Sequence, residues 1–308
     1  KGIVKHNVLG GKNIIIFAPT SSGKTLVGEI VSVHYAMAKK RALYLVPMKA
    51  LAEEKYHHFK AMYGELGIKT IVSTHDRKEY DQDLERKEFH IAVVVFEKLN
   101  SLLVKNPNLL EGVGLIVIDE LQMMGDESRG AGLELLLTKI LVSPFRPQLL
   151  GLSAVLGDAE DLARWLKAEL LVETRRPVEL RKGILSRGVF SYLEHNSGIE
   201  GEEVWPLPAD DEKGMSSLHA AKYLAEANNE QSIIFVPDKL ATEMFSEKLK
   251  DLVDFPPAEH ALEELKSFED SYSKDLLSSL LSKGVAIHNA DLSWEQRDLV
   301  ERYFRQGE

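Results

Sequence analysis

Short apolar runs alternate with longer amphipathic stretches from residue 13 onward, and this alternation constrains the fold of the 308-residue chain more than any other feature. Several runs are almost continuous in Ile, Val and Leu, as expected of parallel strands that helices cover on both faces. Between them, segments 26–39 and 132–141 carry apolar residues at helical spacing. The pattern predicts an α/β fold built on a parallel sheet. The predicted strands are 13–17, 42–46, 70–73, 91–95, 115–118 and 149–153.

A second domain is expected because a chain of this length can bury two separate cores. The first pattern ends at Thr174-Arg175-Arg176-Pro177, so the predicted domains are residues 1–176 and 177–308. Residues 180–193 alternate like strands, and the Gly-, Glu-, Asp- and Pro-rich segment 194–213 is predicted to be a mobile loop. Helices are then predicted at 216–227, 240–249 and 276–281, and strands at 231–236 and 284–287.

Composition narrows the class of protein. No apolar run is long enough to cross a bilayer and no signal segment opens the chain, which favours an intracellular protein, cytoplasmic or, in a eukaryote, nuclear. The absence of cysteine excludes disulfides and thiolate metal sites, and the histidines show no metal-ligand spacing. The net charge of −10 argues against gripping nucleic acid through bulk electrostatics alone, although backbone amides and a few lysines can still hold phosphates.

Residues 18–25, Ala-Pro-Thr-Ser-Ser-Gly-Lys-Thr, join the first predicted strand to the first predicted helix. In this context backbone N–H groups surround a phosphate, Lys24 reaches the β- and γ-phosphates, and the Thr25 hydroxyl ligates Mg²⁺. Ala18 stands where the general pattern has glycine. The alternative is a serine-rich turn that caps a helix, with Lys24 in solvent, and the strand-loop-helix context favours the phosphate loop. The predicted phosphate-binding residues are Thr20, Ser21, Ser22, Gly23, Lys24 and Thr25.

Two adjacent carboxylates, Asp119 and Glu120, follow the apolar run 115–118. We expect Asp119 to hold Mg²⁺ and Glu120 to accept a proton from the water that attacks the γ-phosphate. The alternative, that Asp119 only caps the following helix, is less favoured because a phosphate loop precedes it in the chain.

Three more loops follow predicted strands, at 47–51, 96–99 and 153–155. The binding crevice of an open parallel sheet lies beyond the carboxyl ends of its strands, so all five loops are expected along one edge. Taken singly, Lys49 and Lys98 are more often solvated surface lysines. The clustering of the loops is what predicts a functional crevice there.

The order of these motifs resembles that of a superfamily 2 DExD/H-box helicase. They are Ala-Pro-Thr-Ser-Ser-Gly-Lys-Thr, Val-Pro-Met-Lys-Ala-Leu-Ala-Glu-Glu-Lys-Tyr, Glu-Lys-Leu, Asp-Glu-Leu-Gln and Leu-Ser-Ala. Arg129-Gly130 with Glu134, Ile-Ile-Phe-Val-Pro at 233–237 and Gly-Val-Ala-Ile-His at 284–288 resemble the Ski-two-like branch. That branch includes archaeal replication-repair helicases and the helicase domain of DNA polymerase theta.

The resemblance implies two RecA-like domains that hold ATP and Mg²⁺ between them and bind single-stranded or forked nucleic acid. It assigns nucleotide chemistry to Lys24, Thr25, Asp119 and Glu120. It further implies a monomer acting on DNA rather than RNA, with 3′-to-5′ polarity, in replication or repair. The residues it assigns to coupling are Gln122 and Ser153, and those it assigns to nucleic-acid contact are Pro47, Lys49, Ala50, Glu97, Lys98 and His288.

Several positions depart from the family pattern. Gln122 stands where many relatives have histidine, Val155 replaces a threonine, and Asn289 and Asp291 stand where His and Gly are common. These changes bear on coupling and strand grip more than on ATP binding. No arginine-finger motif occurs, so we expect a fragment with an incomplete second domain that binds ATP–Mg²⁺ but hydrolyses it poorly.

Three other functions remain open from the residues. One is an RNA helicase of the same branch. Another is a different phosphate-loop ATPase or kinase, which would leave Gln122 and Ser153 without a role. The third is a binding module whose altered coupling residues no longer support turnover.

Overall fold

The computed structural model describes residues 8–77, 79–154, 157, 159–208 and 215–308. The chain divides into two compact units, and each is considered by itself. The first extends to Leu180 and also includes His195–Ser197, and the second comprises Arg181–Glu194 and Gly198–Glu308. The division thus lies four residues beyond the boundary expected after residue 176.

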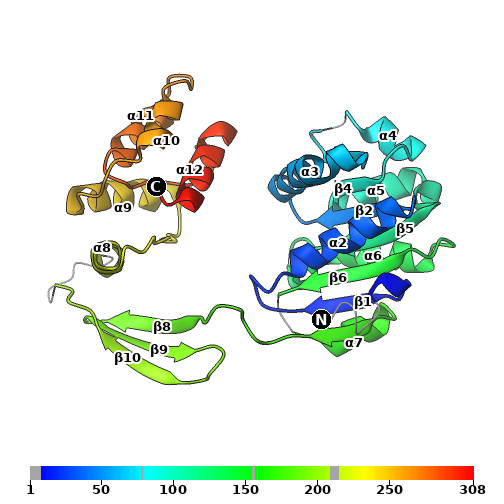
Figure 1. Ribbon diagram of the computed structural model, residues 1–308, viewed down its shortest axis with the longest axis horizontal. Helices are drawn as coiled ribbons and strands as arrows, with labels where there is room; N and C mark the ends of the chain where they lie inside the picture. The colour runs from blue at the N-terminus through cyan, green and yellow to red at the C-terminus, as the bar shows by residue number, and fades with distance from the viewer. Residues whose placement is uncertain (1–7, 78, 155–156, 158, 209–214) are drawn as a thin grey trace. The chain divides into compact units, whose positions relative to one another are not determined.

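The first unit is built on a seven-stranded, wholly parallel sheet with strand order β3-β4-β2-β5-β6-β1-β7 (Figure 1). All six predicted strands are present, which confirms the α/β class. A seventh, β7, was not predicted; it is short and pairs with β1 at the sheet edge. The strands are β1 Ile14–Phe17, β2 Arg41–Val46, β3 Thr70–Ser73, β4 Ile91–Val95, β5 Val113–Ile118, β6 Gln148–Ser153 and β7 Glu169–Val172.

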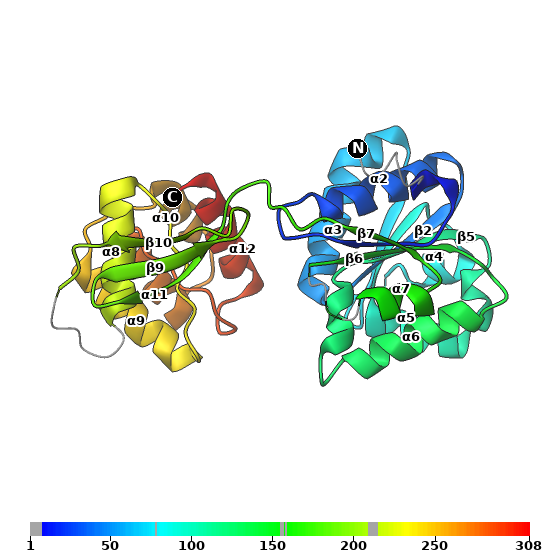
Figure 2. The same cartoon turned by 90° about the horizontal axis from the view of Figure 1, so that it is seen from below.

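Helices cover both faces of this sheet (Figure 2). Successive strand residues point to opposite faces, so Ile14 and Ile16 pack under α2 and α3 while Ile15 and Phe17 pack under α5, α6 and α7. This two-sided burial explains why the strands read as continuous apolar runs. The helices are α2 Lys24–Met37, α3 Lys49–Tyr63, α4 Asp81–Arg86, α5 Phe96–Lys105, α6 Gly130–Val142 and α7 Ala159–Trp165, with 3-10 turns η1 Val8–Gly10, η2 Gly64–Leu66, η3 Pro107–Leu110 and η4 Leu121–Gly125.

Strand order brings the five predicted loops together. The strands that precede them, β4, β2, β5, β6 and β1, form one uninterrupted block of the sheet. Because the block is parallel, all five loops leave it at the carboxyl edge. Segments more than a hundred residues apart in sequence therefore become neighbours.

The second unit contains a three-stranded antiparallel sheet, β10-β9-β8. The strands are β8 Arg181–Ser186, β9 Val189–Glu194 and β10 Glu200–Val204, and a turn with positive φ at Arg187 and Gly188 joins the first two. Strand segments were expected at residues 180–193, and β8 and most of β9 lie there. The prediction of a mobile loop at 194–213 was wrong at residues 200–204, which form β10 and pair with β9. Gly201 lies against the Tyr192 ring, and the absence of a side chain there allows the strands to pair closely. Residues 209–214 lie outside the described residues.

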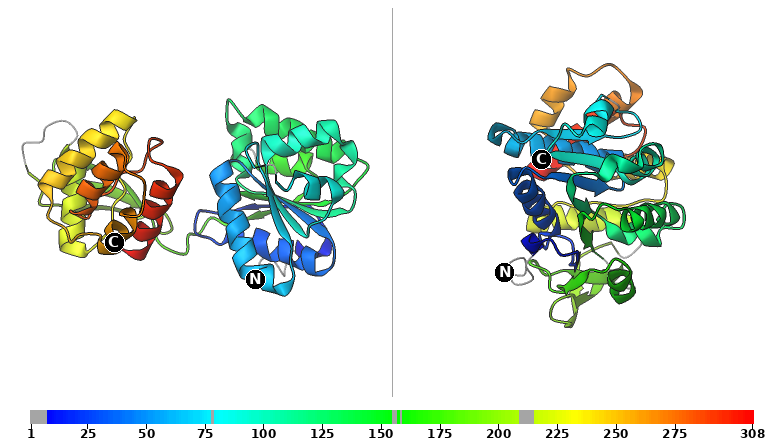
Figure 3. Two further views of the ribbon diagram at one scale, coloured as in Figure 1. Left: turned by 90° about the horizontal axis from the view of Figure 1, so that it is seen from above. Right: turned by 90° about the vertical axis from the view of Figure 1, so that its right-hand side faces the viewer.

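The described residues of the second unit also form five helices, and Figure 3 shows α9 to α12 grouped together. These four helices share one apolar core. The prediction of strands at 231–236 and 284–287 was wrong, since no strand occurs within 215–308. An apolar run becomes a strand only beside a pairing partner. Phe235 instead stands 92% exposed, and Ile287 is buried among the helices. The helices are α8 Met215–Asn228, α9 Lys239–Leu252, α10 Glu259–Leu265, α11 Tyr272–Leu281 and α12 Trp294–Gln306.

A helix that spans a membrane must reach a certain length and apolarity. Every helix among the described residues is too short or too polar to cross a bilayer.

Candidate nucleotide site

The loop after β1 turns sharply into α2. The Ala18 N–H donates to the Ser153 carbonyl at 3.0 Å, which ties the start of the loop to the end of β6. Ser21 and Gly23 have φ of 65° and 86°, a left-handed conformation that glycine adopts without strain. The helix begins at Lys24. Its first N–H groups lack intrahelical partners and are available to donate to a phosphate.

The Lys24 side chain folds back over this loop. Its Nζ donates to the Ala18 carbonyl at 2.6 Å and to the Pro19 carbonyl at 2.9 Å. Burial lowers the Lys24 pKa, the nearby Glu120 and Asp119 carboxylates oppose that shift, and Arg176 adds to it. Neutral carbonyls are weaker partners for an ammonium than phosphate oxygens, so an incoming phosphate can take their place.

Asp119 lies at the end of β5 and is 7% exposed. One carboxylate oxygen accepts from the Tyr44 hydroxyl at 2.9 Å and the other from the Glu120 N–H at 3.0 Å. Burial raises the Asp119 pKa, and the Tyr44 hydrogen bond counteracts that rise. Tyr44 on β2 was not anticipated as a site residue. The available signal was a lone phenol within an otherwise apolar buried strand.

Tyr44 fits because α2 has a glycine where it passes over β2. A Cβ at Gly28 would come within 3.1 Å of the Tyr44 hydroxyl oxygen and 3.0 Å of Leu152. Burial also raises the Tyr44 pKa well above its usual value, so the hydroxyl keeps its proton and donates to Asp119. The phosphate-loop helix thus contributes to holding the metal-binding candidate in place.

Glu120 adopts a left-handed backbone conformation, with φ of 54° and ψ of 46°. This conformation costs a non-glycine residue about 1 kcal/mol or more and persists only where its surroundings impose it. The Asp119 carboxylate accepts a hydrogen bond from the Glu120 N–H, and the Gln122 amide donates one to the Glu120 carboxylate. Strain of this kind is often found at functional sites, which agrees with the role predicted for Glu120.

Gln122 joins the loops that follow β5 and β6. Its Nε2 donates to Glu120, and its Oε1 accepts from the Ser153 hydroxyl at 3.1 Å and from the Ala154 N–H at 3.2 Å. An amide suits this position because it donates and accepts at the same time. The structure therefore brings the two predicted coupling residues into contact. Val155 lies outside the described residues.

The loops after β2 and β4 are joined by Arg129. Its guanidinium donates to the Glu97 carboxylate at 2.6 and 2.9 Å and also to the Pro47 carbonyl. Two residues predicted to contact nucleic acid are thereby brought together. Ala50 is exposed in the first turn of α3, on the same loop as Pro47.

The predicted nucleic-acid lysines differ in their surroundings. Lys49 is exposed and pairs with Asp76. Lys98 is almost fully buried, and its Nζ pairs with Asp81 at 2.5 Å, so its ammonium serves an internal ion pair. In the second unit, the exposed His288 pairs with Glu301 at 2.9 Å.

Two observations test whether the site suits a nucleotide with Mg²⁺. The Ser22 hydroxyl is buried in the phosphate loop without a hydrogen-bond partner among the described residues, as expected of a group that awaits a ligand. No cluster of three or more metal-binding side chains occurs in the described part of the chain, but Mg²⁺ in phosphate-loop proteins needs only a Ser/Thr hydroxyl, a carboxylate and phosphate oxygens. Thr25 and Asp119 are residues of these types.

Comparison with known proteins supplies the family. Residues 3–162, just over half of the chain, match the model of the DEAD/DEAH box helicase family. The chain belongs to that family. It is similar to the ATP-dependent DNA helicase Hel308 of Thermococcus kodakarensis, with 38% identity over 309 residues that cover 99% of this chain and 26% of the relative.

Two further relatives of this DEAD/DEAH box chain carry the same name. The Hel308 protein of Methanocaldococcus jannaschii is 34% identical over 99% of this chain and 25% of its own length. That of Pyrococcus abyssi is 36% identical over 97% of this chain and 40% of its own length. The chain thus spans between a quarter and two fifths of these relatives.

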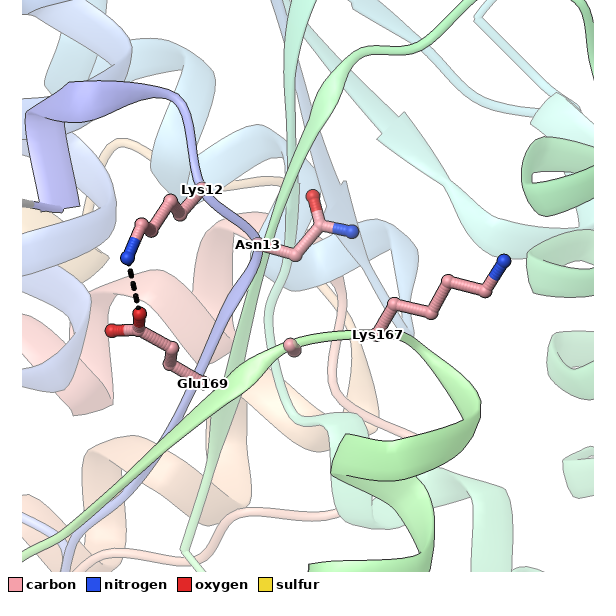
Figure 4. A pocket seen from close by; sticks show the side chains of 5 residues that line it. Lys12, Asn13, Lys167 and Glu169 are labelled. Carbon is pink, nitrogen blue, oxygen red and sulfur yellow. Dashed lines mark hydrogen bonds and ion pairs between the residues drawn. The ribbon is translucent and has the colours of Figure 1, made fainter.

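A shallow pocket elsewhere in this helicase-family chain is not the nucleotide site. Lys12, Asn13, Lys167 and Glu169 line it, with an ion pair between Lys12 and Glu169 at 2.7 Å (Figure 4). Lys12 and Asn13 precede β1, Lys167 precedes β7 and Glu169 begins it, so the pocket lies at the amino edge of the sheet. The phosphate loop leaves the opposite edge.

Proposed function

We propose that this chain is the ATP-binding part of an ATP-dependent DNA helicase that moves along single-stranded DNA. One observation carries the proposal: the loops after five adjacent parallel strands meet at one edge, where Gln122 and Arg129 tie them together. The name of the relatives, ATP-dependent DNA helicase, supports ATP as substrate and DNA as partner. Replication or repair and 3′-to-5′ movement are part of this proposal.

In this proposal the phosphate loop binds the nucleotide and Lys24 leaves its carbonyl partners for the β- and γ-phosphates. Thr25 and Asp119 would hold Mg²⁺, which would neutralise charge on the phosphate oxygens. Glu120 orients the attacking water and accepts its proton. The adjacent Asp119 is engaged by Tyr44 and by the Glu120 backbone, which leaves the Glu120 carboxylate to serve as the base.

Gln122 links this chemistry to movement. A change at Glu120 during hydrolysis alters the hydrogen bond from Gln122, and Gln122 is bonded in turn to the loop after β6. Pro47, Lys49, Ala50 and Glu97 are proposed to follow the DNA backbone, since a motor that reads no sequence contacts phosphate and sugar. Lys98 then stabilises this surface through its ion pair with Asp81. His288, which pairs with Glu301 in the second unit, is proposed to contact the DNA.

The test uses the full-length protein and compares its ATPase rate alone, with single-stranded DNA and with single-stranded RNA of matched length and sequence. We expect DNA to stimulate turnover and RNA to have little effect. Lys24→Ala serves as the control that removes the phosphate-loop ammonium. A rate that neither nucleic acid changes would refute the helicase proposal and favour a different phosphate-loop ATPase. Stimulation by RNA alone would assign the chain to the RNA helicases of its branch.

A further inference from the structure

Arg176, four residues beyond the end of β7, places its guanidinium against the phosphate loop. Its Nη1 donates to the Thr20 hydroxyl oxygen at 3.0 Å. Its Nε is buried and has no hydrogen-bond partner among the described residues. Arg129 and Arg302, by contrast, each pair with a carboxylate. No carboxylate in the described ranges pairs with Arg176, so it is a cation beside the loop with unused donors.

The backbone around Arg176 is held in place. Its N–H donates to the Asn196 Oδ1 at 2.8 Å, and the Asn196 Nδ2 donates back to the Arg176 carbonyl at 3.0 Å. The Glu179 carboxylate accepts from the Asn196 N–H at 2.8 Å and from the Leu180 N–H at 2.9 Å. The neighbouring His195 ring lies 3.0 Å from the Thr174 carbonyl. Residues 195 and 196, in the turn between β9 and β10, thus hold the segment from Thr174 to Glu179 through hydrogen bonds. The turn residues and this segment both belong to the first unit.

Two positive charges meet at the loop. Burial is the main cause that lowers the Lys24 pKa, and Arg176 adds a smaller lowering effect of its own. Thr20, which accepts from Arg176, lies four residues before Lys24. Bringing like charges together is unfavourable unless anions offset the repulsion. The Glu120 and Asp119 carboxylates offset part of it at Lys24, but neither pairs with Arg176. A polyphosphate is the anion that this loop is built to receive.

We propose that Arg176 is a phosphate-binding residue of this site, which adds a second cation from the same unit to the terminal phosphates of a bound nucleotide. Asn196 is its positioning residue. A guanidinium presents several donors in one plane, so it can keep its bond to Thr20 and offer the unused donors to phosphate oxygens. This inference rests on the proposed nucleotide-binding function and adds the interdomain segment to the site.

The test measures dissociation constants of fluorescent ATP, ADP and AMP analogues with Mg²⁺ for the full-length protein. Losing one charge-assisted contact weakens binding about 10-fold to 100-fold, and this loss is expected of Arg176→Gln with ATP and ADP. AMP, which lacks the terminal phosphates, should be affected much less. Arg176→Lys should restore part of the ATP affinity, and Asn196→Ala should lower it in the same phosphate-dependent way.

Arg175→Gln is the matched control, since Arg175 is an exposed neighbour of equal charge. It should leave all three affinities unchanged. If Arg176→Gln binds ATP like the wild type, or weakens all three nucleotides equally, the inference is overturned and Arg176 only tethers the segment. A wild-type protein that binds no ATP would instead refute the proposed function. Unchanged thermal unfolding without nucleotide would show that the variants are folded.

Discussion

Replacing Tyr44 by phenylalanine tests the account of Asp119 most directly. The substitution removes one hydroxyl from a buried position and keeps the ring that packs against Phe59. Of the two hydrogen-bond donors to the Asp119 carboxylate, Tyr44 and the Glu120 N–H, only the second then remains. A hydrogen bond to a charged group contributes about 1.5–3 kcal/mol to the free energy of unfolding. We expect a loss of about 2 kcal/mol at neutral pH.

The loss should depend on pH. Burial raises the Asp119 pKa in the folded state and the Tyr44 bond lowers it, so Tyr44→Phe raises it further. A raised pKa means that protonated Asp119 favours the folded state, and that this stabilisation disappears as the pH rises through the folded-state pKa. The extra cost of the substitution is therefore full at neutral pH. It shrinks once the pH falls below the pKa of Asp119, where a neutral carboxyl loses only an ordinary hydrogen bond of about 1 kcal/mol.

Tyr35→Phe provides the matched control on the same face of the sheet. The Tyr35 hydroxyl donates to the neutral Gln148 amide at 2.8 Å, also in the buried core. Its loss should cost about 1 kcal/mol at every pH. Urea unfolding of both variants at neutral and mildly acidic pH measures the comparison. Equal costs for the two variants, or a Tyr44→Phe cost that does not change with pH, would refute the reasoning.

Three further predictions concern turnover, coupling and acid stability. Glu120→Gln should slow ATP hydrolysis about 10²-fold or more with ATP affinity retained, measured by single-turnover kinetics; an unchanged rate would show that Glu120 is not the base. Gln122→Ala should reduce DNA stimulation of ATPase while the ATP dissociation constant stays within about 2-fold, because it breaks the link to Ser153 and leaves the phosphate loop intact. Hydrogen bonds from Arg302 and Tyr303 lower the Glu264 pKa to about 2, so the stability that this ion pair contributes is present above the ordinary Glu pKa and lost as the pH falls toward 2. Arg302→Met should therefore move acid unfolding of the second unit, followed by circular dichroism, to higher pH, and an unchanged midpoint would contradict this.

Local patterns were sufficient for six of the seven described strands of the first unit. Each of its predicted strands is an apolar run whose neighbours in sequence already indicate two-sided burial, and the phosphate loop is continuous in the chain. The parallel arrangement followed from the helices between strands, and it placed all five loops at one edge before any contact was known.

The strands expected in the second unit show the limit of such patterns. Residues 231–236 and 284–287 have strand-like composition, yet neither forms a ladder in the described residues. Strand formation requires a partner, and the identity of the partner is not encoded in the run itself. The reverse holds for β10, whose sequence has three glutamates and one glycine in five residues and still forms a strand because β9 is beside it.

The sequence by itself determined six strands of the first unit, the phosphate loop and the paired acids, because each is a pattern of residues adjacent in the chain. Only the tertiary structure decided which side chains act on them. Tyr44 and Asp119 are 75 residues apart, and Arg176 and Thr20 are 156 apart. Lys98 was expected to face nucleic acid and is instead enclosed with Asp81. Such contacts arise from strand order and packing, and no local spacing contains them.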